Sequence, residues 1–143
     1  MQAGPYHNLR FVSLWQFPYV DAFYYDLKQM DSKKHRELTG VSNEVILDNL
    51  RRLSGSGANV SLRFPIIPGC NDDPENLQSM SKLIQSLDGR PELWLLPYHR
   101  FGVGKYEQMQ KAYPLPEIEP PSSQKTEEIR EFFSKEGIFP KNQ

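Results

Sequence analysis

Short apolar segments alternate with longer amphipathic segments along most of the chain, and this alternation restricts the possible folds most strongly. The apolar segments cover residues 22–28, 59–67 and 93–97 and are rich in aliphatic and aromatic residues. Such segments are typical of β-strands. Strands separated by helices form parallel sheets, because a helix can provide the long connection that parallel pairing needs. The sequence therefore predicts an α/β fold with three parallel strands and covering helices.

The amphipathic segments carry the start and stop signals of helices. Polar side chains that cap helices stand before each segment, and a glycine follows each one. Apolar residues recur at helical spacing, as Ile46, Leu50 and Leu53 do in the first segment. The expected boundaries are Ser42 or Asn43 to Gly55, Asp73 to Gly89, and Ser123 to Gly137. The last of these predicts a Schellman motif, in which Ile138 packs back on the helix.

The size and charge of the chain exclude several classes of protein. A chain of 143 residues corresponds to one domain. Its 17 basic and 18 acidic residues give a net charge of −1, which argues against binding to nucleic acid or to an anionic membrane. The sequence shows neither a signal peptide pattern nor an apolar run of transmembrane length. Cys70 is the only cysteine, so no internal disulfide can form, and we expect a cytoplasmic protein.

Ionisable side chains stand near the carboxyl end of each expected strand. Asp26 and Lys28 are two residues apart and therefore share a face. Arg63 lies opposite the apolar face of the second strand, and His99 follows the third strand in phase with Leu95. Functional groups of parallel α/β proteins collect at this edge. This set of charges predicts a site for an anionic or zwitterionic small ligand.

Each of these residues also has an ordinary structural interpretation. Asp26 and Lys28 can form a partly exposed ion pair, and Arg63 can extend from a sheet edge into solvent. His99 can be a hydrogen-bonded loop residue. Their coincidence at one edge of three successive strands favours a site. Cys70 has no nearby histidine in the sequence, so a small loop residue is a better interpretation than a nucleophile.

The same residues belong to an ordered set of motifs that resembles a known family. The family is that of the activating enzymes of glycyl-radical enzymes, within the radical S-adenosylmethionine superfamily, and the subgroup is the one that acts on pyruvate formate-lyase. The resemblance extends over residues 18–139. The motifs that carry it are residues 26–31, 39–43, 63–69, 71–72, 95–99, 105–106 and 120–121.

The resemblance implies a fold and a chemistry. Members of this family have a partial (β/α)6 barrel similar to a TIM barrel, of which residues 18–143 would be the C-terminal half and residues 1–17 an unassigned segment. They bind a 4Fe–4S cluster through a CxxxCxxC loop. An electron from the cluster cleaves S-adenosylmethionine, and the resulting radical abstracts hydrogen from a glycine of the partner enzyme.

The resemblance also implies roles for individual residues. Asp26 and Lys28 match the strand end that serves the methionine part of S-adenosylmethionine, and Asp26 would also approach a monovalent cation. Arg63 and His99 match residues that line the same pocket. The implied partners are a glycyl-radical enzyme similar to pyruvate formate-lyase and a flavodoxin or ferredoxin as reductant.

The cluster motif is absent from these 143 residues. We therefore expect no catalytic residue in this part of the enzyme, the 4Fe–4S cluster only in a full-length protein, and little activity from this chain alone. One alternative is a non-catalytic half-barrel that binds a protein partner or a nucleoside-like ligand. Another is a small α/β domain that binds a phosphorylated metabolite. In a half-barrel, one edge of the strand at 22–28 would lack its neighbouring strand and leave a row of backbone groups unpaired. Self-association is therefore expected.

Overall fold

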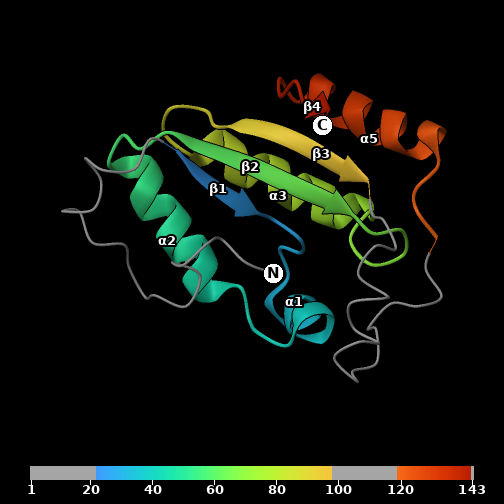
Figure 1. Ribbon diagram of the computed structural model, residues 1–143, viewed down its shortest axis with the longest axis horizontal. Helices are drawn as coiled ribbons and strands as arrows, with labels where there is room; N and C mark the ends of the chain where they lie inside the picture. The colour runs from blue at the N-terminus through green and yellow to red at the C-terminus, as the bar shows by residue number, and fades with distance from the viewer. Residues whose placement is uncertain (1–21, 98–118, 143) are drawn as a thin grey trace.

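Four parallel strands with helices on one side make up the structure, a computed structural model that describes residues 22–97 and 119–142 (Figure 1). The strands are β1 (Phe23–Asp26), β2 (Val60–Ile66), β3 (Glu92–Pro97) and β4 (Lys141–Asn142). The helices are α1 (Ser32–Thr39), α2 (Glu44–Gly55), α3 (Pro74–Ser86) and α5 (Ser123–Lys135). The sheet order is β1-β2-β3-β4, and each described pairing is parallel. The predicted parallel α/β fold is confirmed.

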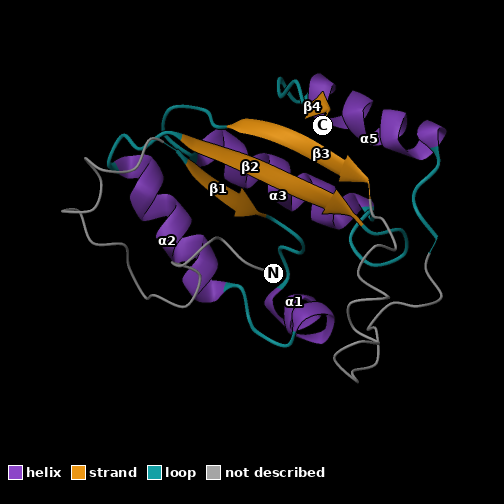
Figure 2. Cartoon of the chain, viewed as in Figure 1, coloured by secondary structure: helices purple, strands orange, loops and turns teal. Residues whose placement is uncertain are grey.

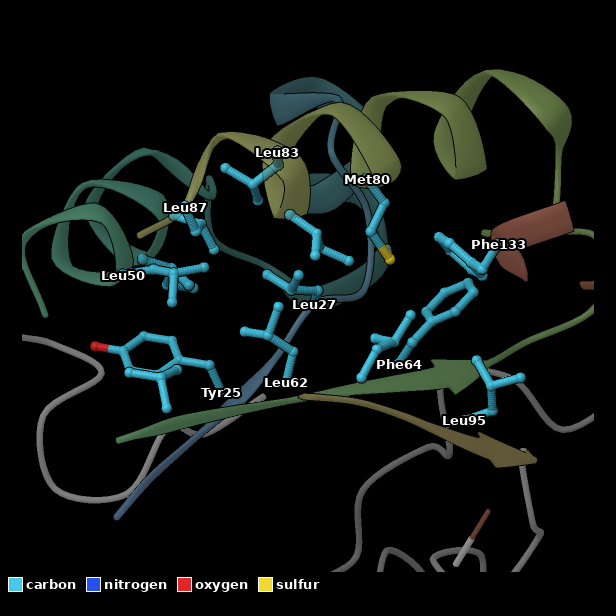
Figure 3. Packing of buried hydrophobic residues seen from close by; sticks show 14 of the residues in the cluster. Tyr25, Leu27, Leu50, Leu62, Phe64, Met80, Leu83, Leu87, Leu95 and Phe133 are labelled. Carbon is cyan, nitrogen blue, oxygen red and sulfur yellow. The ribbon is translucent and has the colours of Figure 1, made fainter. Parts of the chain in front are cut away.

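Alternation along the strands separates the two faces of the sheet. In β2, Val60, Leu62, Phe64 and Ile66 are buried, and the residues between them are partly exposed. The buried strand residues pack against apolar residues of α2, α3 and α5, so these helices cover one face. Figure 3 shows this packing, with Leu62 and Phe64 among side chains such as Leu50, Met80 and Phe133. The opposite face carries the remaining strand residues, which include Asp26 and Arg63.

Two local features differ from the sequence prediction. The structure adds α1, which Asp31 caps by accepting a hydrogen bond from the Lys34 amide and which ends at Gly40. It also adds β4, a strand of two residues beside β3, so the sheet has four strands and not three. Both additions are short and lack an apolar repeat, which explains why periodicity did not predict them.

The helix ends follow the sequence signals. Asn43 and Asp73 occupy the positions before α2 and α3, and Pro74 is the first residue of α3. After α5, the Ile138 amide donates to the Phe133 carbonyl at 2.9 Å and the Gly137 amide donates to the Ser134 carbonyl at 3.0 Å. This pair of bonds is the predicted Schellman motif.

Strand β1 is at one edge of the sheet among the described strands (Figure 2). Self-association through this edge stays a prediction. Residues 1–17 and His99 lie outside the described residues. Within the described ranges, no helix is long and apolar enough to cross a membrane.

The two glycines Gly137 and Gly55 make a matched stability test. Gly137 has a φ of +82°, which strains any residue with a Cβ, whereas Gly55 is helical and a Cβ there would lie 3.8 Å from Asp88 Oδ2. We expect Gly137→Ala to lower the free energy of unfolding by about 1–2 kcal/mol. Gly55→Ala should raise it by roughly 0.5–1 kcal/mol, because alanine loses less backbone freedom on folding. Urea denaturation measures both, and equal effects of the two variants would contradict the motif.

Candidate functional site

Asp26 and Arg63 form an ion pair on the face of the sheet that α2, α3 and α5 leave uncovered. They are partners in the register of β1 and β2, and Arg63 Nε donates to Asp26 Oδ1 at 2.7 Å. The Arg63 side chain keeps 38 % of its surface exposed, so the pair contributes little to stability. The distal guanidinium nitrogens have no partner among the described residues and can bind an anion.

Lys28 lies two residues beyond the end of β1, close enough to Asp26 and Arg63 for both charges to act on its ammonium group. Burial holds the pKa of Lys28 below its ordinary value, the Asp26 carboxylate raises it, and the Arg63 guanidinium lowers it further. The geometry brings Asp26 and Arg63 together, and the grouping of Lys28 with them in a ligand site stays a prediction. A partly desolvated ammonium beside a guanidinium is a strong receptor for a carboxylate.

The fourth predicted site residue, His99, is outside the described ranges, so its place in this group stays a prediction. His99 is expected to share a strand face with Leu93 and Leu95, and this does not support its grouping with Asp26 and Arg63. Both leucines are buried on the helix-covered face, opposite Asp26 and Arg63, and β3 ends at Pro97. Strand alternation therefore carries no information on where His99 points.

Three residues of the uncovered face were missed by the sequence reasoning. Trp94 is the register partner of Arg63 in β3, and Lys141 is the partner of Trp94 in β4. The Lys141 ammonium lies 5.8 Å from the Trp94 ring centroid, and the Arg63 guanidinium lies 5.9 Å from that of Tyr24. These cation–π contacts place aromatic surface directly beside the charged pair. The alternation within β3 places Trp94 on the face opposite Leu93 and Leu95, but its position beside Arg63 follows only when the strand register is known.

Buried side-chain amides form hydrogen bonds with the backbone of the loops that follow β1 and β2. Asn43 Nδ2 donates to the carbonyls of Gln29 and Met30 at 3.1 and 2.8 Å. Asn71 Oδ1 accepts from the Ile67 amide at 2.8 Å, and its Nδ2 donates to the Pro65 carbonyl at 2.7 Å. Sequence reasoning did not identify this network, because asparagines in loops are usually exposed.

Cys70 takes part in the same loop through its backbone. Its carbonyl accepts from Gln29 Nε2 at 3.2 Å. Burial, together with the Asp72 carboxylate, raises the pKa of the Cys70 thiol, so the thiolate that a nucleophile needs is disfavoured. This agrees with the interpretation of Cys70 as a loop residue.

The start of α3 is less suited to an anion than the pair at Arg63. The Asp73 carboxylate accepts from the Asn76 amide at 3.0 Å and therefore occupies the helix N-terminus itself. This disfavours the phosphate-binding alternative at that position. Among the described residues, no group of three or more histidine, cysteine and acidic side chains is placed to hold a metal ion.

The sequence is similar to several curated proteins. It is 44 % identical over 116 residues to a trans-4-hydroxy-L-proline dehydratase activating enzyme from Clostridioides difficile, covering 80 % of this chain and 38 % of that protein. It is 34 % identical over 122 residues to a pyruvate formate-lyase-activating enzyme from Staphylococcus epidermidis, covering 85 % and 49 %. The chain thus spans less than half the length of these relatives. No family model matches.

Solved structures agree with the observed fold. A crystal structure of a domain of pyruvate-formate lyase-activating enzyme from Bacteroides vulgatus superposes with a TM-score of 0.72 at 26 % identity, covering 89 % of this chain and 70 % of that one. A radical SAM methyltransferase from Sphaerobacter thermophilus superposes with a TM-score of 0.59 at 18 % identity, a likeness of fold. It covers 84 % of this chain and 33 % of the methyltransferase.

The charges around Lys28 predict how its pKa responds to a neutral neighbour. Asp26→Asn removes the carboxylate that favours the ammonium form, while the burial of Lys28 remains, so the pKa of Lys28 should fall further. The Lys28 Cε chemical shift measured by NMR against pH gives this pKa. Asp48→Asn, on the exposed side of α2, is the control and should leave it unchanged. A rise on Asp26→Asn would contradict the described geometry.

Proposed function

We propose, from the premise that the chain is a homologue of the activating enzymes of glycyl-radical enzymes, that its uncovered sheet face forms half of a binding site for S-adenosylmethionine. The arrangement of Lys28, Asp26 and Arg63 at the strand ends is the observation that carries the proposal. The activity of the whole protein, its substrate and its partners are parts of this proposal.

The chemistry of the three side chains fits the methionine part of the ligand. That part carries one carboxylate and one ammonium group. The Lys28 ammonium and the free nitrogens of Arg63 would hold the carboxylate, and the Asp26 carboxylate would hold the ammonium. His99 would line the same pocket, and Asp26 would also approach a monovalent cation. S-adenosylmethionine supplies the radical chemistry by which activating enzymes abstract hydrogen from a glycine.

The iron–sulfur cluster does not fit the residues of this chain. A CxxxCxxC loop holds a 4Fe–4S cluster with three thiolates, and these 143 residues contain one cysteine. In the proposed function the cluster ligands therefore belong to polypeptide outside residues 1–143. The partner would be a glycyl-radical enzyme of the pyruvate formate-lyase type, and the reductant a flavodoxin or ferredoxin.

The single cysteine favours a second candidate function. In this alternative the chain is a non-catalytic half-barrel that binds a protein partner or a nucleoside-like ligand without redox chemistry. The two candidates share the ligand-binding face and differ in whether a cluster stands beside it.

Ligand binding tests the shared part of both candidates. Titration of the ¹⁵N-labelled chain with S-adenosylmethionine should give saturable shifts at residues 26–28 and around Arg63. Lys28→Ala and Arg63→Ala should each weaken binding on the order of tenfold, because each removes a charge-assisted hydrogen bond to the carboxylate. Lys82→Ala, exposed on α3, is the control of equal charge change. Equal affinity of all four proteins would overturn the proposed site.

Iron binding tests an expectation that both candidates share, namely that the isolated chain holds no 4Fe–4S cluster. After anaerobic reconstitution, the 143-residue chain should remain colourless and form no deoxyadenosine from S-adenosylmethionine, since one thiolate cannot replace three. A full-length activating enzyme treated in the same way is the positive control. Cluster absorbance with near-stoichiometric iron on a monomeric chain would contradict this expectation.

A further inference from the structure

The side chain of Asn76, in the first turn of α3, joins two segments that are far apart in the sequence, the loop after β1 and the loop before α3. Its Nδ2 donates to the Lys28 carbonyl at 3.3 Å and to the Asn71 carbonyl at 2.8 Å. Its Oδ1 accepts from the Met30 amide at 2.8 Å. The amide thus bonds to the loop after β1 and to the loop after β2 at the same time.

This junction is buried and its donors are fully used. Asn76 is 2 % exposed, and two acceptors match the two hydrogens of its Nδ2. Its backbone amide is occupied separately by Asp73 Oδ2. A buried polar group of this kind is held in place, because any rotation leaves donors or acceptors without partners and costs free energy.

The junction continues to the strand that carries Arg63. Asn71 accepts the Asn76 hydrogen bond with its carbonyl, and its side chain bonds to Pro65, two residues after Arg63. A continuous series of hydrogen bonds therefore runs from Lys28 through Asn76 and Asn71 to Pro65. Its two ends lie beside the charged side chains of the candidate site.

We infer that Asn76 is a positioning residue that fixes the Lys28 ammonium relative to the Arg63 guanidinium. The ligand in this inference, S-adenosylmethionine, is taken from the proposed function. The hydrogen bonds that support the inference are observed and do not depend on that function. β1 ends at Asp26, so sheet pairing holds Asp26 directly, whereas Lys28 lies outside the strand. The last sheet contact is that of the Leu27 amide, which donates to the Arg63 carbonyl at 2.8 Å, and the Asn76 bond to the Lys28 carbonyl restrains the next residue.

The pKa of Lys28 provides a readout that needs no ligand. Burial keeps this pKa low, and among the described residues the ionisable groups that act on it are Asp26 in β1 and Arg63 in β2; His35 in α1 interacts with Lys28 as well. If Asn76 holds Lys28 in its partly buried place, loss of the amide lets the ammonium reach water. The pKa of Lys28 should then rise toward its ordinary value.

The test uses Asn76→Leu, which keeps the volume of the side chain and removes its hydrogen bonds. Leu83→Ala, two turns further along α3 and buried in the core, is the control for general destabilisation. Asn76→Ser takes the place of Asn76→Leu should the latter not fold. Each protein is measured below its own unfolding transition, by the Lys28 Cε titration and by the affinity for S-adenosylmethionine.

We expect the Asn76 variant to raise the pKa of Lys28 and to weaken binding on the order of tenfold, while the control changes neither. Unchanged pKa and affinity in the Asn76 variant, or equal changes in the control, would overturn the positioning role. A pKa rise confined to the Asn76 variant supports that role even where the parent chain binds no S-adenosylmethionine. Absence of S-adenosylmethionine binding by the parent chain would overturn the proposed function and leave the positioning role of Asn76 standing.

Discussion

Hydrogen bonds of buried side-chain amides hold the carboxyl ends of β1 and β2 together, and the candidate site depends on them. Sheet pairing alone brings Asp26 to Arg63, because the two are register partners. Lys28 and the loop at Pro68 lie past the strand ends, where no ladder bonds reach. Asn43, Asn71 and Asn76 supply backbone partners there, and each is buried. Since an unpaired buried amide is costly, the loops have little freedom to separate.

The two faces of the sheet carry different kinds of side chain, because successive strand residues point to opposite faces. One face gives its aliphatic and aromatic side chains to the core under α2, α3 and α5. The other carries Asp26, Arg63, Trp94 and Lys141 in one row across all four strands. Charges and aromatic rings can occupy this row without any cost to core packing. A ligand site on this face is therefore compatible with a well-packed opposite side.

The sequence predicted those parts of the fold that have strong local signals. Strand alternation, the cap at Asp73 and the glycine at Gly137 are such signals, and all three are present in the structure. α1 escaped prediction because only His35 of its eight residues is buried, which leaves no apolar stripe to detect. The pairing of Arg63 with Asp26 and with Trp94 depends on strand register, which the sequence of a single strand does not encode. The amide junction depends on contacts over more than forty residues.

The separation of the two faces explains how this sheet can keep its core packed while its other face stays uncovered. The buried cluster draws on the helices and one side of the strands, so its packing needs no wall opposite the charged row. Helix packing thus holds the sheet in place, and the sheet places Asp26 beside Arg63. The Asn76 side-chain amide then holds the backbone of Lys28 through its carbonyl. The steps from the sheet to Lys28 use residues within 22–97. Recognition of the carboxylate and ammonium of a ligand can therefore be built into this segment, whereas cluster chemistry requires thiolates that it does not contain.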